Sequence, residues 1–486
     1  MNKKYSRALF WFRRDLRLSD NPAMSMAIAE ADQVTPIYLH CQQEEAPWVP
    51  GAASNWWLHH SLTDLQRNVR RLGLVLIIRD GDSSRVMLER LIADTGAAAV
   101  YWNRLYEPAV TERDSQVEEA LSGAGIRVHT FNASLLNEPW EVATRENRPY
   151  KVFTPYYKSC RGGIRPERGL HAPPVRGSGN VSPPDSIAIE RLGLLPRGGW
   201  TDGLARDWTP GEAGAMSALD AFTGSEAPFH YPRDRDLPAS AGVSRLSPHL
   251  HFGEVAPARV WFEVAQRAVI EKREFDAEPY LRQLVWRDFA HHLLYYFPHT
   301  ATEEFNPRFG RFPWRRDPAL FDAWSKGMTG IPLIDAGMRQ LWQSGWMHNR
   351  VRMNVASFLT KHCLIDWRDG ARWFWDTLVD ADLANNTMGW QWAAGCGADA
   401  APFFRIFNPV RQGEKFDPEG DYVRTWIPEL SHLGANRIHK PWDGPDPAGS
   451  LSVAGQTEYY PSPIVDLARG RNDALEAYRS IRNQPE

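Results

Sequence analysis

Five short apolar segments alternate with helix-like segments over residues 1–131 of this 486-residue chain. The segments between the apolar runs, such as Trp56–Leu72 and Arg85–Asp94, are helix-like. Strands that alternate with helices build parallel sheets, because each helix is the crossover that returns the chain to the same edge. Residues 1–131 are therefore predicted to form an α/β domain with a doubly wound, parallel, five-stranded sheet. The apolar runs, rich in β-branched or aromatic residues, are Ala8–Phe12, Val34–Leu39, Leu74–Ile78, Ala98–Trp102 and Ile126–Phe131.

The first predicted strand is not followed by a Gly-x-Gly-x-x-Gly motif. That motif is the fingerprint of a sheet that binds a dinucleotide. We therefore expect the main cofactor to bind outside this domain.

The pattern changes after residue 131. Residues 132–207 are broken by Pro, Gly and Arg, which predicts a long interdomain linker. After Thr209 the apolar spacing is helical, without an internal repeat, and residues 208–486 are predicted to form an all-α domain. The helices expected there include Glu254–Lys272, Pro279–Tyr296, Pro318–Lys326, Ile331–Gln343, Met347–His362 and Gly370–Thr377.

Composition narrows the classes of protein. The four cysteines are far apart and show no metal-ligand spacing, so we expect a reducing compartment and no bound metal. The apolar run Ala8–Phe12 is too short for a signal peptide, and no stretch is long enough to span a bilayer. We therefore expect a cytoplasmic protein without a membrane partner, and a monomer.

Residues 380–392 read Asp-Ala-Asp-Leu-Ala-Asn-Asn-Thr-Met-Gly-Trp-Gln-Trp. Carboxylates removed from water must be paired, and each indole N–H needs a hydrogen-bond acceptor. This concentration of carboxylates, amides and indoles predicts a site for a flat, polar molecule. A capping or turn cluster is the alternative.

Other segments also carry candidate binding groups. Residues 243–247 place serine hydroxyls just ahead of a helix expected near Pro248, an arrangement that suits phosphate, although an ordinary serine N-cap is the alternative. Asn349 and Met353 share one helical face, for which an interhelical contact is the alternative. A further helical stripe consists of Gln283, Trp286, Arg287 and Ala290.

These segments, with residues 396–417, resemble the DNA photolyase and cryptochrome family, and within it the bacterial class I-like cyclobutane-dimer photolyases. The resemblance covers nearly the full chain, is strongest from Pro279 to Glu429, and includes an N-terminal signature at Trp11–Asn21. It implies a deoxyribodipyrimidine photo-lyase: photoexcited, reduced FAD passes an electron to a flipped-out cyclobutane pyrimidine dimer in UV-damaged DNA.

The resemblance also implies how FAD is held. Serines 244 and 247 would contact the pyrophosphate, and Arg352 would pair with Asp380. Asn386 would face N5 of the flavin, where plant-type cryptochromes usually carry Asp. The full set of expected FAD contacts is Tyr231, Val243, Ser244, Arg245, Leu246, Ser247, Arg287, Arg352, Asp380, Ala381, Asp382 and Asn386.

A lesion pocket follows from the same resemblance. Indoles would stack on the unstacked bases, and an amide would bond a base edge. Gln283 departs from the family pattern, because a carboxylate usually stands there and an amide cannot supply a proton. Slower repair or a different preferred lesion is therefore expected. The expected lesion and DNA contacts are Arg235, Gln283, Trp286, Asn349, Arg350, Met353 and Trp392.

Trp390, Trp367 and Trp314 match the family's tryptophan chain for photoreduction, with core packing as the alternative for each. Residues 101–107 are similar to the antenna region. The residues that often hold a folate are replaced near Ala109 and Val110, so a folate, deazaflavin or flavin antenna stays open.

Two other functions are compatible with these residues. The first is a cryptochrome-like blue-light photoreceptor with little or no repair activity, favoured by Gln283 and the net charge of −3 and opposed by Asn386, Asn349 and Met353. The second is an electron-transfer flavoprotein, which the missing nicotinamide fingerprint opposes.

Overall fold

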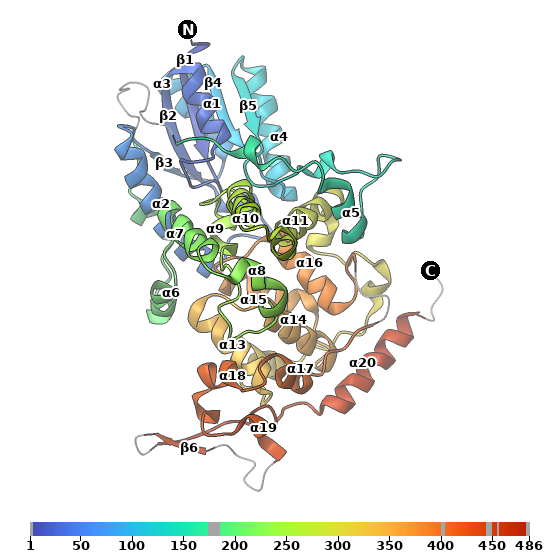
Figure 1. Ribbon diagram of the computed structural model, residues 1–486. Helices are drawn as coiled ribbons and strands as arrows, with labels where there is room; N and C mark the ends of the chain where they lie inside the picture. The colour runs from blue at the N-terminus through green and yellow to red at the C-terminus, as the bar shows by residue number, and fades with distance from the viewer. Residues whose placement is uncertain (1–2, 174–184, 400–403, 444–449, 454–455, 483–486) are drawn as a thin grey trace.

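A computed structural model describes residues 3–173, 185–399, 404–443, 450–453 and 456–482. Residues 174–184 of the predicted linker and residues 400–403 of the 396–417 segment lie outside this described part. Figure 1 shows the strands of the sheet at one end of the molecule and most of the helices below them.

A five-stranded parallel sheet forms the N-terminal domain, with strand order β3-β2-β1-β4-β5. The predicted strands are all present, with shifted ends. Leu74 and Leu76 are buried but precede β3, because Leu74 N–H still bonds the carbonyl of Val69 beyond the end of α2. The strands are β1 (Tyr5–Phe12), β2 (Ala31–His40), β3 (Ile77–Asp80), β4 (Ala99–Asn103) and β5 (Arg127–Phe131).

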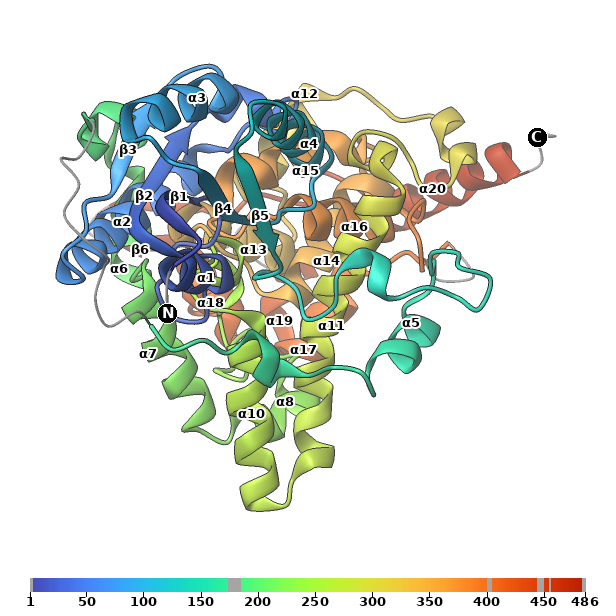
Figure 2. The same cartoon turned by 90° about the horizontal axis from the view of Figure 1, so that it is seen from above.

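The sheet is covered on both faces, as Figure 2 shows from above. Successive residues of a strand point to opposite faces, so Phe10 packs with α1 (Pro22–Glu30) and α2 (Ala52–Arg71). Trp11 packs on the other face with α3 (Ser84–Thr95) and α4 (Pro108–Gly123). This is the doubly wound arrangement that the sequence predicts.

The connection between residues 132 and 207 is mostly irregular. It contains helices α5 (Phe153–Cys160) and α6 (Asp202–Asp207) and several short 3-10 turns, namely η2 (Pro139–Glu141), η3 (Pro166–Gly169), η4 (Ile189–Leu192) and η5 (Gly199–Thr201). The domain boundaries on either side of it stay predictions.

The C-terminal part is helical, as predicted. It differs in one detail, a short hairpin of β6 (Ser450–Val453) and β7 (Gln456–Tyr459). Its first helices are α7 (Glu212–Thr223), α8 (Ala227–Asp234), α9 (Ser247–His251), α10 (Pro257–Glu271), α11 (Glu274–Tyr296), α12 (Pro318–Ser325) and α13 (Pro332–Ser344). They are followed by α14 (Asn349–Ser357), α15 (Trp367–Thr377), α16 (Leu383–Ala394), α17 (Pro409–Phe416), α18 (Asp421–Trp426), α19 (Ala435–Ile438) and α20 (Leu467–Arg482).

One predicted helix divides into two. His348 has extended backbone, and its ring nitrogen accepts a hydrogen bond from Arg350 N–H at 3.2 Å, so α14 begins only at Asn349. Residues Phe358–His362 then continue as a π-helix. Within the described residues, no helix combines the length and apolar character needed to cross a membrane.

The two domains meet at the carboxyl end of β1. Leu16 N–H bonds the carbonyl of Phe252 at 3.1 Å, and Arg17 Nη1 bonds that of Gly253 at 2.8 Å. The indole of Trp57 on α2 donates to Glu254 Oε1 at 2.9 Å. These contacts hold α9, and the helices that pack beside it, against the sheet.

Candidate functional site

Helix α16 organises the predicted site. Its N-cap is Asp382, whose Oδ1 accepts from the backbone N–H of Asn385 at 2.9 Å and from the Asn385 amide at 2.7 Å. The helix rises about 1.5 Å per residue, so Trp390 lies about 6 Å along the axis beyond Asn386. Trp392 follows near the C-terminal end. One rigid element therefore carries predicted flavin contacts at one end and a predicted lesion contact at the other.

Asp380 is buried just before α16. Its two oxygens accept from Arg352 Nη2 at 3.0 and 2.8 Å, the pairing that the family resemblance implies. Asn386 donates its amide N–H to the carbonyl of Ala371 on α15 at 3.1 Å. The amide oxygen of Asn386 is therefore the group left to meet a ligand.

Two histidines that the sequence analysis missed face Asp382. His251 Nδ1 on α9 and His291 Nε2 on α11 lie 3.5 and 3.4 Å from Asp382 Oδ2. Burial alone would raise the pKa of Asp382, but the two imidazoles outweigh burial and hold that pKa well below its ordinary value. A signal was present, because His291 continues the helical stripe of Gln283 and Arg287 by one more turn.

Ser244 lies ahead of α9, as predicted, whereas Ser247 is the first residue of that helix, which is only five residues long. Phosphate binding there would rest on serine hydroxyls and N–H groups more than on a helix dipole. Arg245 has a left-handed backbone with φ of 54°. Its guanidinium lies 4.3 Å from the ring centre of Trp208 and 5.2 Å from that of Trp346, so its side chain is held by indoles.

Two other residues that are expected to contact FAD already make aromatic contacts or hydrogen bonds within the protein. The ring of Tyr231 on α8 packs edge-on to Tyr280 at 5.3 Å and carries the guanidinium of Arg235 at 5.4 Å. Arg287 donates to the carbonyls of Ser134 and Leu250, so it ties α11 to the linker and to α9.

Trp286 on α11 stacks on a residue that the sequence analysis did not consider. The ring of Phe153, from α5 of the linker, lies 3.5 Å from that of Trp286 with an interplanar angle of 10°. One face of the indole is thus covered by the linker. Gln283 donates its amide N–H to the carbonyl of Pro279 at 3.1 Å, which leaves its oxygen as an acceptor.

Helix α14 carries three further residues that are expected to contact the lesion or DNA. Asn349 is exposed, and its amide nitrogen lies 3.9 Å from the sulfur of Met353, so the two side chains are neighbours as predicted. Arg350 forms an ion pair with Asp236 at 2.7 Å and covers the ring of Phe416. Helices α11 and α14, which carry Trp286 and Asn349, both pack against α16, which carries Trp392.

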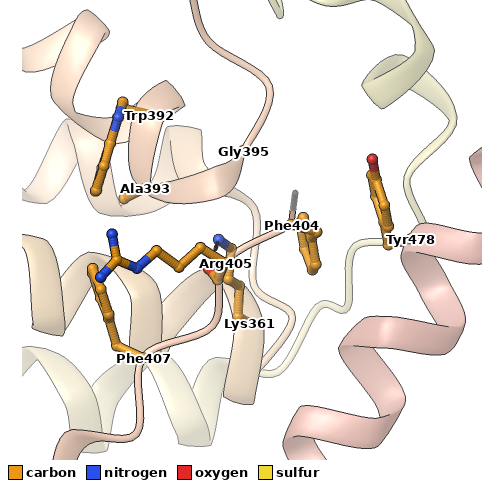
Figure 3. A pocket seen from close by; sticks show the side chains of 8 residues that line it. All are labelled: Lys361, Trp392, Ala393, Gly395, Phe404, Arg405, Phe407 and Tyr478. Carbon is orange, nitrogen blue, oxygen red and sulfur yellow. Dashed lines mark hydrogen bonds between the residues drawn. The ribbon is translucent and has the colours of Figure 1, made fainter. Parts of the chain in front are cut away.

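Trp392 borders a small cavity of about 30 Å³, shown in Figure 3. The Arg405 side chain extends beside Phe407, and the buried Lys361 points toward the backbone of Arg405, to whose carbonyl it donates. Burial lowers the pKa of Lys361 to about 7. No carboxylate among the described residues pairs with this ammonium.

The three predicted electron-transfer tryptophans lie on segments that contact one another. Trp390 on α16 and Trp367 at the start of α15 are buried, and α15 packs on α16. Trp314 is partly buried. The residue after it, Arg315, bridges to Ile365 through an N–H bond to Leu364 at 2.7 Å, which places Trp314 near the start of α15. The indole N–H groups of all three are buried without a hydrogen-bond partner in the described residues.

The residues at this site fit a flavin dinucleotide. Both ring nitrogens of His291 are buried and make no hydrogen bond within the described residues, although Asp382 Oδ2 lies 3.4 Å from Nε2. Carboxylate, amide and arginine groups suit the polar edge of a flavin, and serine hydroxyls suit a diphosphate. In contrast, no group of three or more His, Cys, Asp or Glu within the described ranges is arranged to hold a metal.

Comparisons with known proteins agree with this geometry. Residues 8–175 match the DNA photolyase family, and residues 280–480 match the FAD binding domain of DNA photolyase. The chain is 44% identical to a deoxyribodipyrimidine photo-lyase of Agrobacterium fabrum, with 99% of each chain covered. It is 38% identical to cryptochrome-1 of Arabidopsis thaliana, over 97% of this chain and 70% of that protein.

A solved structure shows the same fold. A bacterial class III photolyase from Agrobacterium tumefaciens superposes with a TM-score of 0.93 and 43% identity, covering 100% of this chain and 99% of that one. The expected class I-like subclass gains no support from this neighbour. The match to an FAD binding domain confirms the expected cofactor.

Proposed function

Because the chain belongs to the DNA photolyase family, we propose that it repairs cyclobutane pyrimidine dimers in UV-damaged DNA under light. The observation that carries the proposal is α16, which joins Asp382, Asn386, Trp390 and Trp392 in one helix. A photolyase needs its flavin and its lesion close together, and the length of this helix sets that separation.

The residues of the flavin end would act by position and charge. Asp380, Asp382 and Asn386 would hold the ring of FAD, and the serines of residues 243–247 would hold its diphosphate. When bound, FAD supplies the light absorption and the electron that splitting the dimer requires. Trp314, Trp367 and Trp390 would relay electrons inward to this site, since indoles are oxidisable and the last two are buried from water.

The residues of the lesion end would recognise a flipped-out dimer. Trp286 and Trp392 would stack on its bases, and each such stack is worth about 1–3 kcal/mol. Asn349 would bond a base edge beside the apolar Met353. Arg235 and Arg350 would contact phosphates from partly exposed positions at the rim. The overall reaction breaks two carbon–carbon bonds and needs no net electron.

The direct test uses purified protein with FAD bound and chemically reduced. We expect illumination to restore thymines in an oligonucleotide that contains one cyclobutane dimer, and no change in darkness. A protein that retains reduced FAD yet leaves the dimer intact under light would refute the proposal. Trp286→Leu should weaken dimer binding about tenfold or more, and Trp342→Leu, a change at an exposed indole on α13, should not.

A photoreceptor without repair is the second candidate, and Gln283 is the observation that favours it. Gln283→Glu restores the carboxylate usual in dimer-repairing relatives. A gain of about tenfold or more in repair would mark the native protein as a weakened enzyme, whereas equal rates would show that the amide is tolerated. Gln343→Glu, on the exposed face of α13, is the matched control.

A further inference from the structure

Two arginines lie against one tyrosine where helix α5 of the linker packs on α11. The guanidinium of Arg282 on α11 lies 5.3 Å from the ring centres of both Tyr157 and Phe153 on α5. The guanidinium of Arg161, the residue that follows α5, lies 6.0 Å from the ring centre of Tyr157. A cation at such a distance from an aromatic ring is attracted by the electrons of the ring. We call Arg161 and Arg282 the Tyr157 arginines.

The rings that hold Arg282 continue to the proposed lesion site. Phe153 stacks on Tyr157 at 5.8 Å and on Trp286 at 3.5 Å, with interplanar angles of 18° and 10°. Both Phe153 and Tyr157 are buried, in an apolar cluster against which Met388 of α16 also packs. The side chain of Arg282 is therefore held by a buried stack of rings, and that stack ends at an indole expected to contact the dimer.

The charge of both arginines is available to an anion. No ion pair within the described residues includes Arg161 or Arg282. Glu278, one turn before Arg282 on α11, accepts from the hydroxyl of Tyr157 at 2.6 Å instead. Nε of Arg282 is buried and has no hydrogen-bond partner in the same part of the chain, so its two Nη groups are the donors left for a ligand. Arg282 is partly exposed and Arg161 is exposed, so an anion in solvent reaches both.

The backbone of DNA suits these two charges. Arg282 and Trp286 lie one turn apart on the same face of α11, which separates them by about 6 Å along the helix axis. One strand of DNA carries a phosphate about every 3.4 Å along its axis. A base that stacks on Trp286 therefore has neighbouring phosphates at the spacing of Arg282. A guanidinium already held by rings loses little freedom when it binds phosphate, which strengthens the contact.

We propose that the Tyr157 arginines bind phosphates that flank the dimer, so that the linker, through α5, forms part of the DNA interface. The inference rests on the proposed function in taking DNA as the partner, but it concerns binding in darkness and not repair. Phosphate contacts position a protein on DNA and carry no information on its bases. The Tyr157 arginines should therefore strengthen binding to damaged and undamaged duplexes alike, whereas Trp286 should act on the dimer.

The test measures, in darkness, the dissociation constants of the FAD-loaded protein for a duplex with one cyclobutane dimer and for the same duplex without it, at several salt concentrations. Each phosphate contact contributes about 0.9 to the slope of log affinity against log salt concentration. The double variant Arg161→Gln, Arg282→Gln should therefore lose about 2 from this slope with both duplexes. The advantage of the wild type over this variant should shrink about tenfold between about 50 mM and about 200 mM salt. Arg161→Gln alone, at an exposed position, should lose about 1.

Two matched variants separate charge at this place from other effects. Arg85→Gln with Arg90→Gln removes the same charge from exposed positions on α3 of the α/β domain and should leave the slope unchanged. Arg161→Lys with Arg282→Lys keeps both charges and should retain most of the slope.

A structural role for Arg282, as a support for Phe153 behind Trp286, predicts weaker binding of the dimer alone at an unchanged slope. That result would overturn the inference, and so would a double Gln variant that binds both duplexes as the wild type does. Binding that shows the expected change in slope, in a protein that leaves the dimer intact under light, would instead refute only the proposed function.

Discussion

The buried ammonium of Lys361 offers a prediction whose size follows from the structure. Its side chain is 3% exposed and donates to the carbonyl of Arg405, with the ring of Phe404 4.4 Å away. Lys361→Met keeps the length of the stem and removes the amine. The variant therefore reports the cost of placing this charge beside Trp392.

The magnitude and sign come from the pKa. Burial lowers the pKa of Lys361 to about 7 in the folded protein, against about 10.4 for a solvated lysine. The folded protein thus binds this proton less readily than the unfolded chain. The resulting penalty on the free energy of folding is about 5 kcal/mol. It is fully present below about pH 7 and vanishes as the pH rises to about 10.4. The carbonyl left without its donor in Lys361→Met costs about 1–3 kcal/mol at every pH.

Lys361→Met should therefore be more stable than the wild type at about pH 6, by about 2–4 kcal/mol, and should lose this advantage as pH rises toward about 10. Urea unfolding at a series of pH values, followed by circular dichroism, measures the difference in unfolding free energy. Lys158→Met, at an exposed position on α5, should show no such trend. A stability difference between Lys361→Met and wild type that stays constant across this range would refute the reasoning.

Three further predictions concern packing. Phe153→Leu should remove the ring behind Trp286 and weaken dimer binding about three- to tenfold, while Phe153→Tyr should not, as measured by gel shift. Gly370→Ala would place a Cβ 2.1 Å from the ring of Trp390. It should therefore destabilise the fold by about 1–3 kcal/mol in thermal unfolding and slow photoreduction of the flavin. Gly389→Ala, where nothing lies within 4 Å of the added Cβ, should do neither. Burial raises the pKa of the thiols, to about 12 for Cys41, Cys160 and Cys363, so the native protein should not react with a disulfide reagent at neutral pH and the denatured chain should expose all its thiols. Rapid labelling of the native protein would contradict this.

Local patterns were enough for the elements and for part of the site. Apolar runs identified every strand of the parallel sheet, most clearly the central strands β1 and β4, because strands covered on both faces need apolar residues. Helical spacing also predicted the neighbouring position of Asn349 and Met353, whereas the pairing of Arg352 with Asp380 was expected from the family resemblance. Helix ends were less predictable, since the cap at His348 depends on a side-chain contact that spacing does not reveal.

The sequence by itself determined the α/β and helical order of this protein, because periodicity acts within a few turns of chain, and its motifs supplied the residues of the proposed flavin and lesion sites through their resemblance to a known family. Only the tertiary structure decided that Phe153 backs Trp286 and that His251 and His291 face Asp382. It alone also showed that Lys361 bonds a backbone carbonyl and meets no carboxylate among the residues that the structure describes. In most cases these contacts join residues that are more than a hundred positions apart in the sequence, or residues that lie on separate helices. Their energies come from burial and charge in three dimensions, which no local pattern encodes.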